Sequence, residues 1–215
     1  ITPGKIGELI KSFLLKQSHN VPIARSAPII IAERLTDMLA LLIIAGFGVL
    51  FFQFGYRALL VCACITIAGL LFLSSTRCHQ FIMKQMRKRG ILKTRIDDLE
   101  EGYLKIQQML HWKTVVSCTA LGIVAWFLEC LALDQIIAGF ESGVPNLLAS
   151  STVYSSTTIF GALSFLPGGL GVTEGSMVLF LERFGLVGTT SLAVTATCLV
   201  RLATLWFAVF LGLVA

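Results

Sequence analysis

The sequence predicts an all-α, polytopic membrane protein, a helical bundle with two re-entrant Pro/Gly-turn hairpins in an inverted repeat. Three observations support this fold class. The chain has a mean hydropathy of +0.85, with 56% hydrophobic and 13% charged residues, whereas soluble domains have about 25% charged residues. Several charge-free runs approach the length of about 20 residues that a membrane-spanning helix needs. A Pro/Gly turn followed by an acid and a distant arginine also occurs twice.

The two copies of this element lie near opposite ends of the chain. In the first, the run PGKIGE ends at Glu8, and Arg34 follows 26 residues later. In the second, the run PGGLGVTE ends at Glu174, and Arg201 follows 27 residues later. Broken helices that recur in two halves and carry ionisable groups are typical of secondary transporters, whose binding site lies near the bilayer midplane. A Pro/Gly turn that arose by coincidence would explain one copy taken alone. Coincidence does not explain why turn, acid and arginine recur at matched spacing in both copies.

The copies define the expected domain organisation. We expect one membrane domain over residues 1–215, an excerpt of a longer protein, because the chain starts inside a motif and stops inside an apolar run. Repeat 1 covers about residues 1–76 and repeat 2 about residues 114–215. An amphipathic cytoplasmic helix within about 77–113 connects them.

The first repeat predicts two membrane spans after a short helix over residues 5–17. One span runs from about Pro28 to Phe52, and the other from Ala58 to Thr76. A tight turn at 55–57 joins them on the outer side. Each run is free of charge for about the thickness of the hydrocarbon core, apart from Glu33, Arg34 and Asp37 at the start of the first span.

The stretch 77–113 is rich in lysine and arginine, and the positive-inside rule places it in the cytoplasm. Apolar residues recur in it at helical spacing from Leu92 to Leu110, which predicts an amphipathic helix over about 79–112. This helix either caps the membrane domain or lies among anionic lipid head groups, aided by the basic cluster 87–89. The sequence leaves both alternatives open.

The second repeat begins with a span over about 114–137 and continues with 32 uncharged residues, 142–173. As one helix this run would be roughly 48 Å long, more than the ~30 Å hydrocarbon core. Because Pro and Gly break the helix at 167–169, we expect a re-entrant hairpin that descends from about Pro145, turns at 167–171 and returns by Gly185. Such a turn is tolerated in a membrane only inside protein or beside water.

The orientation of the last helix, about 186–215, depends on this hairpin. A re-entrant hairpin makes the last helix start outside, whereas the helix with Arg34 starts in the cytoplasm, so the repeats are inverted. If 170–185 spans instead, the repeats are parallel. We expect the inverted arrangement.

Arg201 is the central candidate of the site, because 17 uncharged residues precede it and 14 follow. An arginine at that depth needs a carboxylate, carbonyl groups or an anionic ligand. Its expected protein partners are Glu174 and Glu129. Glu33, Arg34 and Asp37 form the equivalent cluster of the first repeat. These charged residues either form ion pairs that hold helices together or bind substrate. Their recurrence in both repeats favours substrate binding.

Glycine and hydroxyl side chains complete the expected site. Seven of the nine residues 150–158 are serine or threonine, which favours a polar cavity wall over helix packing alone. Gly169→Ala is expected to fold, since it adds one methyl group, but to lose activity. Glu174 either caps a helix start or pairs with Arg201. The predicted substrate-binding residues are Glu8, Arg34, Asp37, Glu129, Ser155, Thr158, Gly168, Gly169, Gly171, Glu174 and Arg201.

An arginine pair, helix N-termini and hydroxyl groups suit an anionic group such as a phosphate, so we expect a lipid head group as ligand. We expect no metal, because Cys62 and Cys64 have no second pair and no nearby histidine. No cofactor and no nucleic acid are expected either.

These motifs resemble the lysylphosphatidylglycerol synthase transmembrane family, also called flippase-like. The resemblance rests on residues 166–175, LPGGLGVTEG, and on Arg201 with its neighbours. It extends to the runs 3–8, PGKIGE, and 33–37, ERLTD, and to the central segment 126–129, WFLE. The resemblance implies a bacterial or archaeal plasma-membrane protein. Some members move lipids or lipid-linked sugars between leaflets, and others are fused to a soluble synthase or glycosyltransferase.

We therefore expect a flippase-like protein that moves a lipid or lipid-linked head group through a polar site between the repeats. Its expected partners are this membrane phospholipid or lipid-linked substrate, anionic head groups at helix 79–112, and a fused or separate soluble enzyme domain. One alternative is the membrane part of a lipid-modifying enzyme, although no nucleophile–base pair supports it. Another is a scaffold that docks a partner enzyme through helix 79–112.

Overall fold

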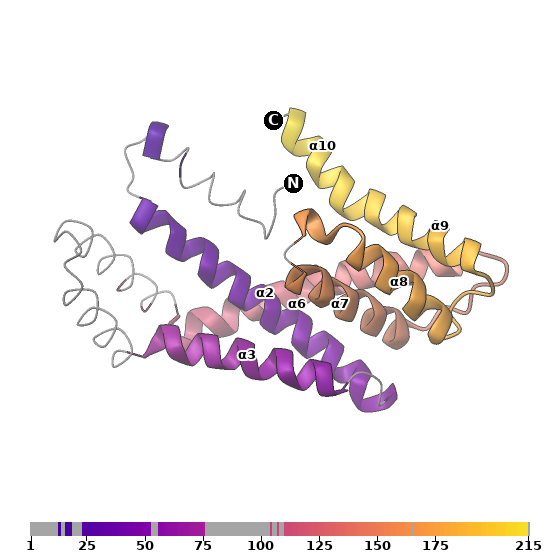
Figure 1. Ribbon diagram of the computed structural model, residues 1–215, viewed down its shortest axis with the longest axis horizontal. Coiled ribbons are helices and arrows are strands. Elements are labelled where there is room, and N and C mark those ends of the chain that lie inside the picture. Colours follow the sequence, from indigo (N-terminus) through magenta and orange to yellow (C-terminus); the bar gives the residue numbers. More distant parts are fainter. Residues whose placement is uncertain are drawn as a thin grey trace. The chain divides into compact units, whose positions relative to one another are not determined.

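The computed structural model describes residues 13, 16–18, 23–52, 56–75, 104, 107, 110–164 and 166–214, with 23–28 and 58 described by backbone alone. Within these ranges the chain forms helices joined by turns and has no strand (Figure 1). The all-α prediction is therefore confirmed. The chain divides into two compact units: the first contains Ala40–Leu60 and Ile123–Ala215, and the second contains Ile6–Leu39 and Val61–Gly122.

The long apolar runs form long helices. These are α2 (Ile23–Phe52), α3 (Tyr56–Ser74), α6 (Trp112–Ala138), and α9 (Thr190–Arg201), which continues through a π-helical turn (Leu202–Trp206) into α10 (Phe207–Val214). Among the described residues, three stretches are long and apolar enough to cross a membrane: Ile29–Phe52, Trp112–Ala138 and Thr190–Val214. The apolar part of α3 is shorter. Each span predicted from the sequence overlaps one of these helices, but the last helix begins at Thr190 instead of about 186, and residue 76 of the second span lies outside the described residues.

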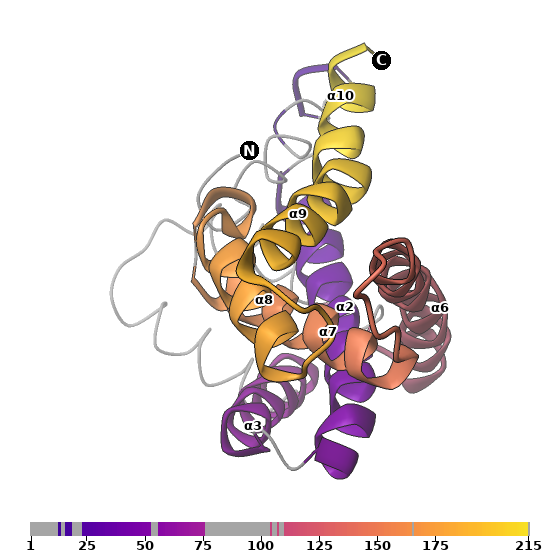
Figure 2. The ribbon, with the colours of Figure 1, turned by 90° about the vertical axis from the view of Figure 1, so that its right-hand side faces the viewer.

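Two shorter helices of the first unit, α7 (Leu147–Leu163) and α8 (Val172–Arg183), form an antiparallel hairpin (Figures 1 and 2). At its base the Val144 N–H donates to the Leu186 carbonyl at 3.0 Å. Its tip is a single 3-10 turn, Pro167–Gly169. The turn thus lies where the sequence predicted it. Re-entry of this hairpin into a membrane stays a prediction.

Local sequence signals fix the ends of both hairpin helices. Asn146 caps α7, and its side-chain oxygen accepts the Ala149 N–H at 3.1 Å, as expected for an N-cap asparagine. Pro167 cannot donate a backbone hydrogen bond and so prevents α7 from continuing. Gly185 has a φ of 63° just after α8, where a glycine commonly ends a helix.

Small residues let the two arms approach closely at the tip. A Cβ on Gly169 would lie 2.9 Å from the Gly161 Cα and 2.6 Å from the Thr173 Oγ1. Gly169 also has a φ of 67°, which side chains rarely adopt. That Gly169→Ala folds stays a prediction, but the added methyl group meets backbone on the facing arm, so we expect the variant to be less stable than wild type.

The core of the first unit lies between α6, the hairpin and α9. Its fully buried apolar side chains include Leu133, Ile137, Val153, Met177, Leu181, Ala193, Ala196 and Val200. The α2 segment of this unit also packs on the hairpin, with Gly48 against Thr152 and the Phe52 and Phe184 rings 4.9 Å apart. On the outside, large apolar side chains such as Leu50 and Leu213 are about four-fifths exposed. Extensive apolar exposure is expected of a surface that contacts lipid.

The second unit contains the parts of α2, α3 and α6 that lie outside the first unit. In it the Leu35 side chain lies 3.8 Å from the place of a Cβ on Gly69, which brings α2 and α3 into contact. The Gln107 side chain donates to the Ser74 carbonyl at 3.3 Å. Most of the predicted amphipathic helix 79–112 lies outside the described residues. The division into two repeats and their inverted relation stay predictions.

Candidate functional site

The hairpin tip has an unusual backbone. Gly168, Gly169 and Gly171 have φ values of 64°, 67° and 84°, all in the left-handed region that glycine adopts without steric cost. This conformation turns the chain sharply between α7 and α8. It also leaves the Gly168 carbonyl to accept a hydrogen bond from a side chain of another helix.

That side chain is Arg201, the last residue of α9. Its Nε donates to the Glu174 Oε1 at 2.7 Å, and its Nη2 donates to the Gly168 carbonyl at 2.8 Å. The Arg201 side chain is only 11% exposed, compared with 28% for Glu174. Figure 2 shows α9 beside α8, which brings the end of α9 to the tip. We call these three residues the Arg201 cluster, and the predicted pairing of Arg201 with Glu174 is present in it.

Glu174 serves the hairpin and the arginine at once. Its Oε2 accepts the Gly171 N–H at 2.7 Å at the start of α8, while its Oε1 accepts from Arg201. The sequence left open whether Glu174 is a helix cap or a partner of Arg201, and the structure gives it both roles. A carboxylate in the first helical turn is stabilised by the helix dipole, so Glu174 keeps favourable contacts if Arg201 changes partner.

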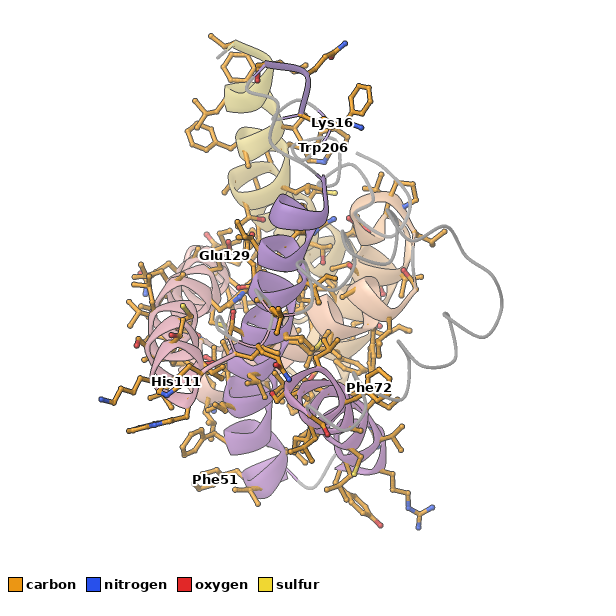
Figure 3. The ribbon with its side chains drawn as sticks, turned by 90° about the vertical axis from the view of Figure 1, so that its left-hand side faces the viewer. Lys16, Phe51, Phe72, His111, Glu129 and Trp206 are labelled. Carbon is orange, nitrogen blue, oxygen red and sulfur yellow. The ribbon has the colours of Figure 1, made fainter. Side chains whose placement is uncertain are left out.

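Glu129, the other expected partner of Arg201, accepts a hydrogen bond from a tyrosine. The Tyr154 Oη of α7 donates to the Glu129 Oε2 of α6 at 2.5 Å. Figure 3 labels Glu129 on α6 and Trp206, which ends the π-helical turn after Arg201. Tyr154 also interacts electrostatically with both Glu129 and Arg201. The tyrosine was missed as a site residue, although it stands within the hydroxyl-rich stretch that the sequence singled out.

The predicted hydroxyl groups of α7 mostly bond to their own helix. Ser155 Oγ donates to the Ser151 carbonyl at 2.6 Å, and Thr158 Oγ1 to the Tyr154 carbonyl at 2.8 Å. Serine and threonine in helices commonly bond one turn back in this way. These bonds explain how hydroxyl groups are accommodated in a buried helix, so a substrate-binding role for Ser155 and Thr158 stays a prediction.

A buried polar pair that the sequence did not reveal lies between α6 and α7. Ser150 Oγ donates to the Asp134 Oδ1 at 2.8 Å, and both residues are buried. Ser150 lies in the first turn of α7, where the positive end of the helix dipole favours a carboxylate. This pair ties the base of the hairpin to α6. Asp134 stood at the end of an apolar run and gave no spacing signal.

The first-repeat cluster lies in the second unit. Arg34 Nη1 lies 3.2 Å from the Asp37 Oδ2, and Arg34 Nη2 lies 3.4 Å from the Glu33 Oε1. These residues are neighbours along one helix, as their sequence spacing implies. Glu8, the remaining predicted residue, lies outside the described residues.

A π-helical turn directly follows Arg201, from Leu202 to Trp206. No residue pattern in the sequence predicts this turn. Such turns are rare and occur often at functional sites, because they add a residue to a helical turn and change the direction of the side chains around it. Arg201 therefore stands at the junction between a regular helix and an irregular one.

Comparisons with known proteins identify the family. The family described as "Lysylphosphatidylglycerol synthase TM region" matches residues 1–212, so the chain belongs to this family. A "UPF0104 membrane protein" of Methanothermobacter thermautotrophicus is 30% identical over 118 residues, which are 54% of this chain. The match covers only 34% of that relative's length. No solved structure gives a significant match.

Proposed function

We propose that this member of the lysylphosphatidylglycerol synthase transmembrane family translocates the head group of a lipid, or of a lipid-linked substrate, between membrane leaflets. The Arg201 cluster carries the proposal. In it a largely buried guanidinium pairs with one carboxylate and one carbonyl at the tip of a hairpin. Ionisable groups at such depth in a membrane protein mark substrate pathways.

The lengths of the hairpin helices support membrane re-entry. The 17 residues of α7 extend about 25 Å and the 12 residues of α8 about 18 Å, both short of the ~30 Å hydrocarbon core. The hairpin also closes at its base through the Val144–Leu186 hydrogen bond. A hairpin of this size that enters from one surface returns to the same surface, with its tip inside the bilayer.

At the tip, an anionic head group can replace Glu174 on Arg201. Guanidinium groups bind phosphate and carboxylate oxygens with similar paired geometry. Moving a charge away from its partner inside a membrane is costly unless a new partner replaces it. If a phosphate replaces Glu174 as the partner of Arg201, the positive charge of the arginine stays paired. Glu174 then keeps its hydrogen bond from the Gly171 N–H. The site thus provides a polar binding position for the head group within the hydrocarbon core of the membrane.

The remaining parts of the proposal concern the topology and the partners of the protein. The protein spans the plasma membrane several times, with the basic stretch 77–113 in the cytoplasm. The two Pro/Gly elements form inverted repeats, and the cluster at Arg34 is the counterpart of the Arg201 cluster. A fused or separate soluble enzyme supplies or uses the lipid that is moved.

Reconstitution into vesicles tests this function. Purified protein in phosphatidylcholine vesicles with fluorescent phosphatidylglycerol is expected to expose inner-leaflet label to an external quencher faster than protein-free vesicles do. Arg201→Lys is expected to abolish most of this rate, because an ammonium cannot reproduce the paired hydrogen bonds of a guanidinium. Arg183→Lys is the matched control, since Arg183 is exposed at the other end of α8. Equal rates for wild type and Arg201→Lys would reject the role of Arg201.

A further inference from the structure

Tyr154 is a buried polar residue that the proposed exchange at Arg201 does not use. Its side chain lies in the middle of α7 and is 3% exposed. Its hydroxyl donates to the Glu129 carboxylate at 2.5 Å, and it interacts electrostatically with Arg201. The hydroxyl therefore bonds to a carboxylate of α6 and is within the electrostatic influence of Arg201 on α9.

The Thr204 hydroxyl is a further neighbour of the Tyr154 hydroxyl. Thr204 lies in the π-helical turn, three residues after Arg201, and its Oγ1 donates to the Val200 carbonyl at 2.9 Å. A hydroxyl group has one proton to donate. In the structure Tyr154 donates to Glu129 and Thr204 donates to Val200, so either hydroxyl group can donate to the other by turning from its present acceptor.

This proton count allows two arrangements of the same groups. In one, Tyr154 donates to Glu129, as the structure shows. In the other, Tyr154 turns its proton to Thr204, and Glu129 gives up the tyrosine as its donor. A partly buried carboxylate that loses one donor is held less firmly in its position. The position of the Tyr154 proton thus affects how firmly the Glu129 carboxylate is held beside α7.

We infer that Tyr154 is a positioning residue of the head-group site, which holds Glu129 in place until Arg201 changes its partner. The inference rests on the proposed function and deepens it. When a head group takes Arg201 from Glu174, the end of α9 and the π-helical turn move with the arginine. Thr204 is the group of that turn that lies next to Tyr154, so it conveys the change to α7 and α6.

Tyr154→Phe tests this role, because it removes the hydroxyl group and keeps the buried ring. The expected result is a translocation rate lower by about tenfold or more, as for the loss of a hydrogen bond to a charged group. The affinity for short-chain phosphatidylglycerol should change by less than about threefold, since Arg201, Glu174 and Gly168 are untouched. Tyr56→Phe is the matched control, because Tyr56 is exposed at the start of α3.

The outcomes separate this inference from the proposed function. A wild-type protein that moves no label rejects both. Wild-type activity with an equal rate in Tyr154→Phe rejects only the role of Tyr154. A rate and an affinity that fall together also overturn it, because Tyr154 would then serve binding itself. If Tyr154→Phe does not fold, Thr204→Val removes the neighbouring hydroxyl and keeps the branched side chain. It is expected to slow translocation at unchanged affinity, and a normal rate would overturn the inference.

Discussion

Glycine-to-alanine substitutions at the hairpin tip can separate two contributions to the loss of stability expected at Gly169: the left-handed backbone conformation and the steric overlap with the facing arm. Gly171 has a positive φ but open space around the place of a Cβ, so Gly171→Ala should cost only the left-handed backbone, about 1–2 kcal/mol. Gly161 is helical, and its Cβ would collide with Thr173, so Gly161→Ala should cost about 1–3 kcal/mol of overpacking. Gly169→Ala incurs both costs, about 2–5 kcal/mol.

The fourth variant is the control. Gly175 lies within α8 and has a helical backbone, and apart from its own helix no atom of the described residues lies within 4 Å of the place of a Cβ. Gly175→Ala should therefore stabilise the helix by about 0.5–1 kcal/mol. The measurement is the free energy of unfolding in detergent micelles, from circular dichroism during a denaturant titration. If Gly169→Ala is as stable as Gly175→Ala, the close approach of the two arms is refuted.

Three further predictions concern the ion pair, the hairpin base and topology. The losses of lipid affinity in Glu174→Gln and Arg201→Gln should be coupled by about 1 kcal/mol or more in a double-mutant cycle, and additive losses would leave Glu174 as a helix cap only. Ser150→Ala should lower the free energy of unfolding by about 1.5–3 kcal/mol, because it removes the donor of a buried carboxylate, and an unchanged value would contradict that account. Cysteines at Ser142 and Gly188, in a background without native cysteines, should react with an impermeant reagent from the same side of the membrane. Reaction from opposite sides would exclude re-entry.

The main elements of the fold could be predicted because they depend on local chemistry. Pro167 lacks a donor and the glycines after it tolerate positive φ, so the turn follows from composition. The 32 uncharged residues of 142–173 exceed one membrane span, so a break was required. The helices themselves follow from runs that are apolar for about one bilayer thickness.

The contacts of the site could be predicted only in part. Arg201 had two possible carboxylate partners, and only packing decides that Glu174 lies beside it while Tyr154 bonds Glu129. Composition also cannot tell whether a serine faces a cavity or bonds its own helix, as Ser155 does. The π-helical turn has no proline or glycine to reveal it. These features depend on three-dimensional neighbours rather than on spacing.

The central claim is that Arg201 binds the phosphate of a lipid head group. It can be measured by solid-state NMR on protein with carbon-13 in its arginine guanidinium groups, reconstituted in phosphatidylglycerol-containing vesicles. The account predicts that lipid phosphorus dephases one guanidinium carbon signal that is present in wild type and missing in Arg201→Lys, while Arg183→Lys retains it. Dephasing that is identical in wild type and Arg201→Lys would contradict the claim.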